Sequence, residues 1–64
     1  MMTPEEERMA EALAVERVHG NRAHIFIAER VGALALIGDA AGIERWKQIA
    51  EKLMQLRGEG VRRQ

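Results

Sequence analysis

The sequence has no cysteine, no serine and no tyrosine, and it has a single threonine among its 64 residues. Together with lysine, these residue types supply most of the covalent nucleophiles of enzymes. Their scarcity argues against group transfer through a covalent intermediate, and without cysteine no disulfide can form. We therefore expect a protein that is not an enzyme and that uses no cofactor and no metal.

The sequence also lacks an excess of either charge and lacks a long hydrophobic run. Ten acidic and ten basic residues balance, whereas nucleic-acid binders usually carry a basic excess, so binding to nucleic acid is not expected. The longest apolar run, residues 31–38, is too short to cross a membrane. The acidic start MMTPEEERM does not have the pattern of a signal peptide. We expect a cytoplasmic protein with no membrane partner and no evident small-molecule substrate.

Most of the remaining residues are good helix formers, and glycines divide them into segments of helix length. The first segment opens with Thr3 and Pro4, and Glu6 follows three residues after the threonine. This is the pattern of a capping box with proline at the first helical position. Gly20 suits the left-handed conformation that ends many helices. The pattern predicts a helix over residues 4–19.

Two further helices follow after short connections. Asn21 is the predicted N-cap of a helix over residues 21–37, which Gly38 ends. Asp39 is the predicted N-cap of a helix over residues 40–57. Connections of two or three residues make neighbouring helices antiparallel or sharply crossed.

These segments predict an all-α fold, a compact three-helix bundle with short glycine-containing turns. Residues 1–58 form the domain, Gly58 ends the third helix, and residues 59–64 form a flexible, frayed tail without periodicity. A domain of this size buries only about 60% of the surface of its unfolded chain. We therefore expect a small core that needs good helix packing or self-association to supplement it.

The first and third helices differ in how clearly they define a buried face. In the third helix the apolar residues fall on one side, namely Ile43, Trp46, Ile49, Ala50, Leu53, Met54 and Leu56. In the first helix the predicted inward residues are Met9, Ala10, Ala12 and Leu13, with Val15 and Val18 on the far side. The single tryptophan is the largest of these side chains and is expected to anchor the core.

The second helix is apolar over most of its circumference, which is typical of a central helix or of one shared with another chain. We therefore expect it to lie at the centre of the bundle. Ala28, Gly32 and Ala35 form a strip of small residues along it. Because Gly32 costs about 1 kcal/mol relative to alanine in a helix, we expect close packing against another helix there.

One edge of the second helix is the candidate partner surface. Phe26, Ala33 and Ile37 lie there beside Arg22 and Arg30. If the other two helices cover the broad apolar arc, this edge is left for a protein partner or for a second copy in a homodimer. The expected function is a small non-enzymatic protein-interaction or regulatory module that acts through apolar helix faces. The competing interpretation is a monomer in which Phe26 and Ile37 pack under the chain ends.

Two histidines invite comparison with metal sites and acid–base sites. Glu16 and His19 give one Glu-x-x-His, half of the ligand set of di-iron helical bundles, but the sequence has no second copy. We expect His19 instead to end its helix near the negative end of the helix dipole. We expect His24 to be partly buried and hydrogen-bonded to a backbone carbonyl or to Glu16. A pH-sensitive interface role is the alternative.

A helix-turn-helix DNA-binding protein is the alternative function. Ala28 and Gly32 have the Ala-x-x-x-Gly spacing of the first helix of that motif, in which Gly32 makes the turn. The residues that follow, 33–37, are apolar and offer nothing that reaches base edges. Basic residues on the third helix are accompanied by acidic ones, which weakens attraction to phosphates. These residues are Arg45, Lys47, Lys52, Glu44 and Glu51.

Short motifs spread over residues 4–57 carry a resemblance to a protein family. They are Glu7-Arg8, the run from Ala10 to Arg17, His19-Gly20, the run from Ile27 to Arg30, Gly38-Asp39 and Arg45-Trp46. With these motifs the sequence resembles a family of short bacterial helical proteins, a domain of unknown function. The resemblance implies a bacterial origin and a small stand-alone helical domain. It implies no activity, no cofactor and no site residues for this chain.

Overall fold

The computed structural model describes the backbone of residues 1–62 and the side chains of residues 1–58. The helices are α1 (Pro4–His19), α2 (Ala23–Leu36) and α3 (Ala40–Arg62), and a short 3-10 helix, η1 (Gly20–Arg22), joins the first two. No strand occurs in this part of the chain, so the predicted all-α fold is confirmed. Over the same residues, none of the helices combines the length and the apolar composition that a membrane crossing requires.

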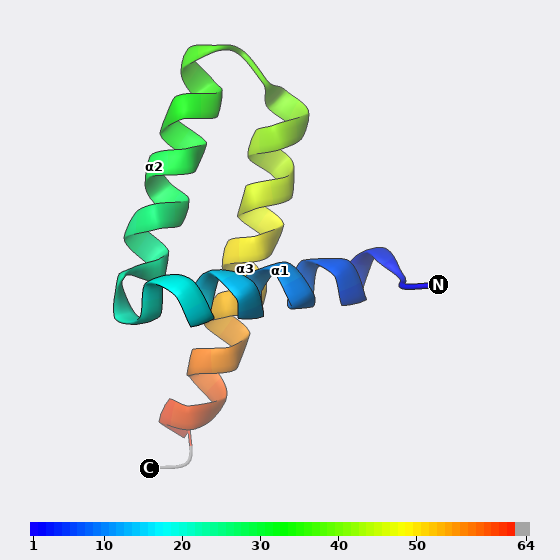
Figure 1. The fold of residues 1–64 in the computed structure, drawn as a ribbon, viewed down its shortest axis with the longest axis vertical. Coiled ribbons are helices and arrows are strands. Elements are labelled where there is room, and N and C mark those ends of the chain that lie inside the picture. The colour runs from blue at the N-terminus through cyan, green and yellow to red at the C-terminus, as the bar shows by residue number, and fades with distance from the viewer. Residues whose placement is uncertain (63–64) are drawn as a thin grey trace.

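The three helices form two layers. α2 and α3 make an antiparallel hairpin, and α1 lies across the half of this hairpin that is remote from its turn (Figure 1). The molecule extends 19 Å in its shortest direction, which fits two helix layers packed about 8–10 Å apart. The half of the hairpin next to its turn therefore has no third helix over it.

The central helix is α3 rather than α2. α3 packs against both α1 and α2, whereas α1 and α2 contact each other less, close to the turn that joins them. The prediction that the second helix is central is therefore wrong. The reason is length and pattern, because α3 spans 23 residues with one clear apolar face, whereas α2 has only 14 residues.

The start and the end of α1 lie at the predicted residues. The backbone N–H of Glu6 donates to Oγ1 of Thr3 at 3.1 Å, and the N–H of Thr3 donates to Oε1 of Glu6 at 2.8 Å. The capping box is thus complete, and Pro4 occupies the first helical position. Gly20 has a φ of +58° and follows the last residue of the helix. The predicted start at the capping box and the predicted end at His19 are confirmed. The predicted left-handed cap is wrong, because the ψ of Gly20 is −130°, outside the left-handed helical region.

The start of α2 differs from the prediction. Asn21 lies inside the 3-10 helix, where the N–H of Ala23 donates to the carbonyl of Gly20, and α2 begins only at Ala23. An N-cap needs a non-helical backbone, which a residue inside a helical turn does not have. Arg22 precedes α2 and makes no side-chain capping bond. The prediction of Asn21 as the N-cap is therefore wrong.

The turn between α2 and α3 has a Schellman geometry followed directly by a cap. The N–H of Gly38 donates to the carbonyl of Ala35 at 3.1 Å, and the N–H of Asp39 donates to that of Leu34 at 2.9 Å. Gly38 has a φ of +74°, a conformation that favours glycine. Oδ1 of Asp39 accepts from the N–H of Gly42 at 2.9 Å. The predicted helix end at Gly38 and the predicted N-cap at Asp39 are both confirmed.

The end of α3 lies beyond the predicted position. Gly58 has no positive φ, and the helix continues through it to Arg62. The prediction that Gly58 ends the helix is wrong, because a glycine ends a helix only where it leaves the right-handed conformation. The predicted tail, residues 59–64, is thus helical as far as residue 62, and residues 63–64 lie outside the described residues.

Among the residues whose side chains are described, the core is as small as the length predicts, and each α-helix contributes two buried residues to it. The buried side chains are Ala12 and Val15 from α1, Ala23 and Ile27 from α2, and Ile49 and Leu53 from α3. Partly buried side chains pack against them, namely Phe26, Val31, Trp46, Ala50 and Leu56.

The predicted positions of several side chains on α1 and α3 need correction. Val15 is buried although it was expected on the far side of α1, whereas Leu13 is exposed. On α3, Met54 is 71% exposed although it was expected in the core. α1 has apolar residues all around it, so its sequence does not define one face. Met54 lies at the edge of the α3 face, where α1 and α2 do not reach.

Candidate interaction surface

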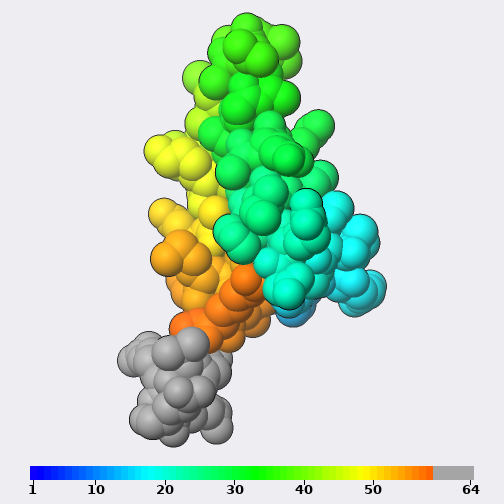
Figure 2. Space-filling model, turned by 90° about the vertical axis from the view of Figure 1, so that its left-hand side faces the viewer, coloured from blue at the N-terminus to red at the C-terminus, as the bar shows by residue number. Residues whose placement is uncertain are grey.

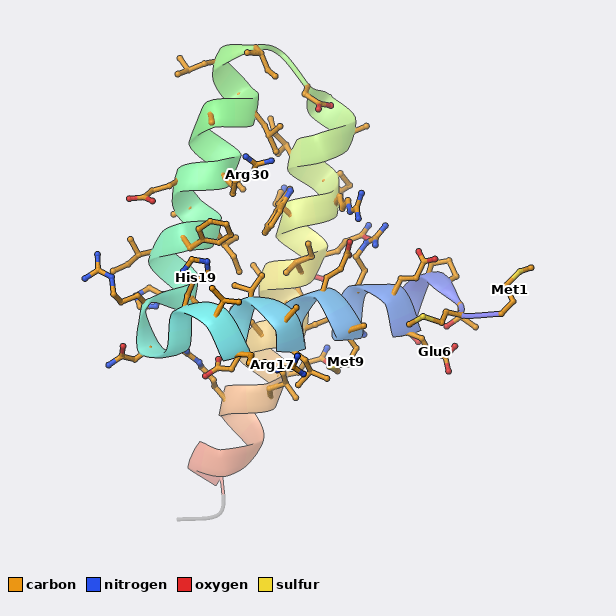
Figure 3. All side chains as sticks on the ribbon, viewed as in Figure 1. Met1, Glu6, Met9, Arg17, His19 and Arg30 are labelled. Carbon is orange, nitrogen blue, oxygen red and sulfur yellow. The ribbon has the colours of Figure 1, made fainter. Side chains whose placement is uncertain are left out.

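Two residues of the predicted partner surface contact Trp46 of α3: Phe26, which is half-buried, and Arg30, which is otherwise exposed. The ring of Phe26 meets that of Trp46 edge to face, with centroids 5.8 Å apart and planes at 71°. Arg30 reaches from α2 toward α3, and its guanidinium lies 5.5 Å from the Trp46 ring centroid (Figure 3). The ring of His19 stacks on Phe26 at 4.0 Å. Phe26 and Arg30 therefore help to hold α2 on α3.

The other three residues of the predicted surface are exposed. Arg22, Ala33 and Ile37 all face solvent, and Ile37 is 76% exposed. The sequence predicts these five residues as one uncovered edge of α2. It does not predict that Trp46 of α3 contacts two of them, Phe26 and Arg30. A signal was present in the sequence, since Phe26 and Arg30 are four residues apart and can meet the same aromatic ring.

A larger exposed apolar surface lies on the side of α2 that points away from the core. At 100° per residue, its residues fall within an arc of about 100°, opposite to Ala23, Ile27 and Leu34. They are Ile25, Ala28, Gly32, Ala35 and Leu36, and all five are exposed. We call them the outer face of α2. Figure 2 shows this side of the molecule, where α2 lies uncovered along its length.

Gly32 lies in the middle of the outer face. Within the part of the chain that the structure describes, a Cβ added at this glycine would meet nothing within 4 Å, so no described helix approaches it closely. The expected close packing at Gly32 is therefore absent within the single chain. Leu36, at the end of the same face, is 90% exposed.

The charges at the two ends of α2 oppose its helix dipole. Arg22 stands at the positive N-terminal end, and the first turn contains no acidic residue. Asp39 follows the negative C-terminal end, and the last turn contains no basic residue. Neither Arg22 nor Asp39 forms an ion pair with a residue whose side chain is described. Both side chains are exposed to solvent, and the carboxylate of Asp39 also caps α3 through the N–H of Gly42.

A separate polar cluster joins α1 to α3. The carboxylate of Glu11 accepts hydrogen bonds from two arginines, Arg45 and Arg8, and the bond from Nη1 of Arg8 is 2.7 Å long. Nε of Arg8 also donates to the side-chain oxygen of Gln48 at 3.2 Å. Partial burial raises the pKa of the Glu11 carboxyl, but the bonds from Arg45 and Arg8 outweigh this effect and hold the pKa below its usual range. The same contact raises the pKa of Arg45.

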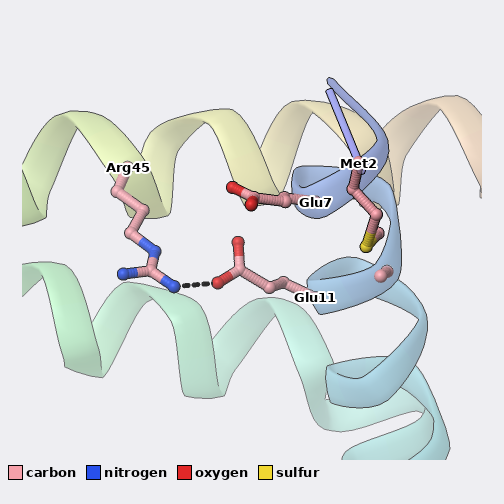
Figure 4. Close-up of a pocket in the computed structure, with 5 residues that line it drawn as sticks. Met2, Glu7, Glu11 and Arg45 are labelled. Atoms are coloured by element: carbon pink, nitrogen blue, oxygen red, sulfur yellow. Dashed lines mark hydrogen bonds and ion pairs between the residues drawn. The ribbon is translucent and has the colours of Figure 1, made fainter. Parts of the chain in front are cut away.

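This cluster borders a hollow of about 350 Å³ on the surface of α1 and α3 (Figure 4). The residues that line it are Met2, Glu7, Ala10, Glu11 and Arg45. Glu11 and Arg45 neutralise each other at its wall, so the side chains that could recognise a charged ligand are already paired. The arrangement is suited to fixing the angle between α1 and α3.

The predicted Glu16–His19 pair is used for packing and bonding. Oε1 of Glu16 accepts from Nη2 of Arg57 at 3.0 Å and from its Nε at 3.2 Å, and Arg57 also donates to the carbonyl of Gly20 at 2.7 Å. His19 ends α1 as predicted. Among the described residues, no three potential metal ligands lie close together. His24 is exposed, so the prediction that it is partly buried is wrong.

The helix-turn-helix spacing does not correspond to a turn. Gly32 lies inside α2, and the chain turns only at Gly38. The two helices of the resulting hairpin run antiparallel (Figure 1), whereas those of the motif cross at about 90–120°. Gly32 therefore does not form the turn that the alternative helix-turn-helix interpretation requires.

Comparison with known proteins identifies a family for this chain. No curated protein and no solved structure matches the sequence significantly. A family model does match, and it covers residues 4–60, which is nearly the whole range over which the structure packs its three helices. The chain therefore belongs to the family of unknown function DUF6961.

Proposed function

We propose that the protein is a small, non-enzymatic protein-interaction module of the bacterial cytoplasm, and that it binds another protein chain on the outer face of α2. The observation that carries the proposal is the exposure of a continuous apolar helix face directly opposite the core. Contiguous exposed apolar surface on a small domain typically marks an interaction site.

The size of the exposed side chains supports this proposal. Leu36 is 90% exposed and Ile25 is 40% exposed. Fully burying such a side chain contributes about 1.5–3 kcal/mol. Among the residues whose side chains are described, six form the buried core, so a partner on this face would add substantially to the apolar contacts of the domain.

The non-enzymatic part of the proposal has separate support. The partly buried carboxylates Glu11 and Glu16 both accept hydrogen bonds from arginines. A general acid or base needs a carboxyl group that is free to exchange a proton with a substrate. Arginine-bonded carboxylates favour a structural role instead.

The proposal is tested with immobilised protein and its variant Leu36→Lys as baits in a lysate of bacterial cells. Val18→Lys is the matched control, because Val18 is 74% exposed but lies on α1. We expect a protein that both the native bait and Val18→Lys retain and that Leu36→Lys loses. Equal retention by all three baits, or retention of nothing combined with a monomeric protein, would contradict the proposal.

A further inference from the structure

We infer that a second copy of this chain occupies the outer face of α2, with the two α2 helices antiparallel and crossing near Gly32. This inference rests on the proposed function and names its partner. Three features carry it, namely the charges at the ends of α2, the distribution of large and small residues along the face, and the size of the face.

The charges at the ends of α2 complement each other only in an antiparallel pair. There, Arg22 of one copy lies opposite Asp39 of the other, and the contact occurs twice because the pair has two-fold symmetry. Arg22 then lies near the negative end of the second α2 and Asp39 near its positive end. The unfavourable position of Arg22 at the start of its own α2 is thus offset by the second chain, whereas Asp39 already has a favourable contact as the N-cap of α3. A parallel pair would not offset the charge of Arg22.

The outer face also has the shape that a crossing pair needs. Crossing helices approach most closely at the crossing point and diverge toward their ends. Ala28 and Gly32 lie near the middle of the face, whereas the larger Ile25 and Leu36 lie near its two ends. In the antiparallel pair, Ile25 of one copy meets Leu36 of the other, so large side chains fill the space where the helices separate.

The size of the face sets the expected strength of the dimer. α2 spans 14 residues, and one helix face is small beside the roughly 1,200–2,000 Å² that a standard stable interface buries. The chain carries no net charge, so long-range repulsion does not oppose the approach of a second copy. We therefore expect a reversible dimer with a Kd in the micromolar range.

Sedimentation equilibrium of the full chain tests the inference. The native protein is expected to dimerise at micromolar concentrations. Leu36→Lys is expected to raise the Kd about 100-fold or more, because each dimer loses two buried leucines. Val18→Lys, the same change on α1, is expected to leave the Kd within about threefold of native. A native protein that stays monomeric to millimolar concentration, or a Kd that Leu36→Lys does not change, would overturn the inference.

A charge variant tests the contact at the ends of the helix. Arg22→Glu is expected to raise the Kd about tenfold, since two attractive contacts with Asp39 become repulsive. The same variant is expected to raise the Tm of the monomer, because an acidic residue at the start of α2 suits the helix dipole. Arg17→Glu, on α1, is the control and is expected to leave the Kd unchanged. Loss of dimer through unfolding would lower the Tm, so the two readouts separate the explanations.

The absence of cysteine makes a test of orientation simple. In the antiparallel pair, Ile25→Cys of one copy lies beside Leu36→Cys of the other, so a mixture of the two variants forms a disulfide under mild oxidation. Two Leu36→Cys copies have these cysteines roughly 16 Å apart along the helix axes, too far for a bond. Rapid disulfide formation by Leu36→Cys alone would show a parallel pair and overturn the inference.

The experiments also separate this inference from the proposed function. A monomeric protein whose Leu36→Lys bait loses a lysate partner would overturn the second copy and retain the interaction function. A monomeric protein that retains nothing would overturn both.

Discussion

The guanidinium of Arg30 lies over the indole ring of Trp46, 5.5 Å from its centroid. Phe26, one helical turn earlier, meets the same indole edge to face. Two neighbouring positions of α2 thus share one aromatic ring of α3. His19, the last residue of α1, stacks on Phe26, so side chains of all three helices meet in this aromatic cluster.

The contact with Trp46 predicts the effect of shortening Phe26. Phe26→Ala is expected to lower the free energy of unfolding by about 2 kcal/mol, less than for a fully buried phenylalanine because the ring is only partly buried. Chemical denaturation, followed by the fluorescence of the single tryptophan, measures this change in the free energy of unfolding. Ile37→Ala, at a 76% exposed position of the same helix edge, is expected to change stability by less than about 0.5 kcal/mol. Equal losses in the two variants would contradict this account of the edge.

Two glycines within helices are expected to respond differently to alanine. Gly32→Ala is expected to stabilise the monomer by up to about 1 kcal/mol, because the added Cβ meets nothing and alanine favours the helix. At Gly42 the added Cβ would lie 2.7 Å from Oδ2 of Asp39. Gly42→Ala therefore displaces the N-cap of α3 and is expected to give no gain. Thermal unfolding in dilute solution measures the stability of both variants. A larger increase in stability for Gly42→Ala than for Gly32→Ala would contradict the role of Asp39 as the N-cap of α3.

The Glu11 cluster predicts a specific loss of stability in acid. The pKa of Glu11 is lower in the folded chain than its usual value, so the unfolded chain binds a proton first as the pH falls. The stabilisation is fully present above the usual pKa of 4.5 and is lost as the pH falls below it through the lower folded value. Glu11→Gln is expected to lose less stability over this fall in pH than the native protein. Glu44→Gln, an exposed acid on α3, is the control, and a native-like acid profile for Glu11→Gln would count against the cluster.

The contact between α3 and the end of α1 requires an arginine. Arg57 bonds both Glu16 and the carbonyl of Gly20, which a lysine cannot do with the same planar geometry. Arg57→Lys is expected to lower the free energy of unfolding by about 1 kcal/mol. Arg17→Lys, at an exposed position of α1, is expected to have no measurable effect in the same denaturation experiment.

The helix boundaries could be predicted where the sequence carries a capping signal. Thr3 with Glu6, and Gly38 with Asp39, act through bonds between residues close in sequence, so local pattern suffices. Gly58 shows the limit of this reasoning, because the same residue type is compatible with a continuing helix. Asn21 shows a second limit, since the 3-10 helix changes the backbone where a cap was expected.

The packing faces could be predicted only for α3, whose apolar residues gather on one side. α1 and α2 are apolar on several sides, so which side is buried depends on how the helices cross. The candidate surface therefore lies more than a third of a turn away from the outer face, at 100° per residue. It includes Phe26, whose ring meets that of Trp46 edge to face. The sequence predicts that α2 has more apolar surface than its neighbours cover. Which side of α2 stays exposed could not be predicted, because it depends on how α1 and α3 pack against the helix.

The most direct test of the central claim is the accessibility of the Leu36 methyl groups to a soluble paramagnetic agent, measured by NMR in dilute and in concentrated solution. The methyl signals of Leu36 are expected to be strongly broadened by the agent in dilute solution, where the chain is monomeric. In concentrated solution the second copy is expected to protect these methyl groups from broadening. The Val18 methyl groups are expected to be broadened in both. Leu36 methyl groups that are as accessible as those of Val18 at every concentration would contradict the claim that the outer face of α2 is covered by a second copy.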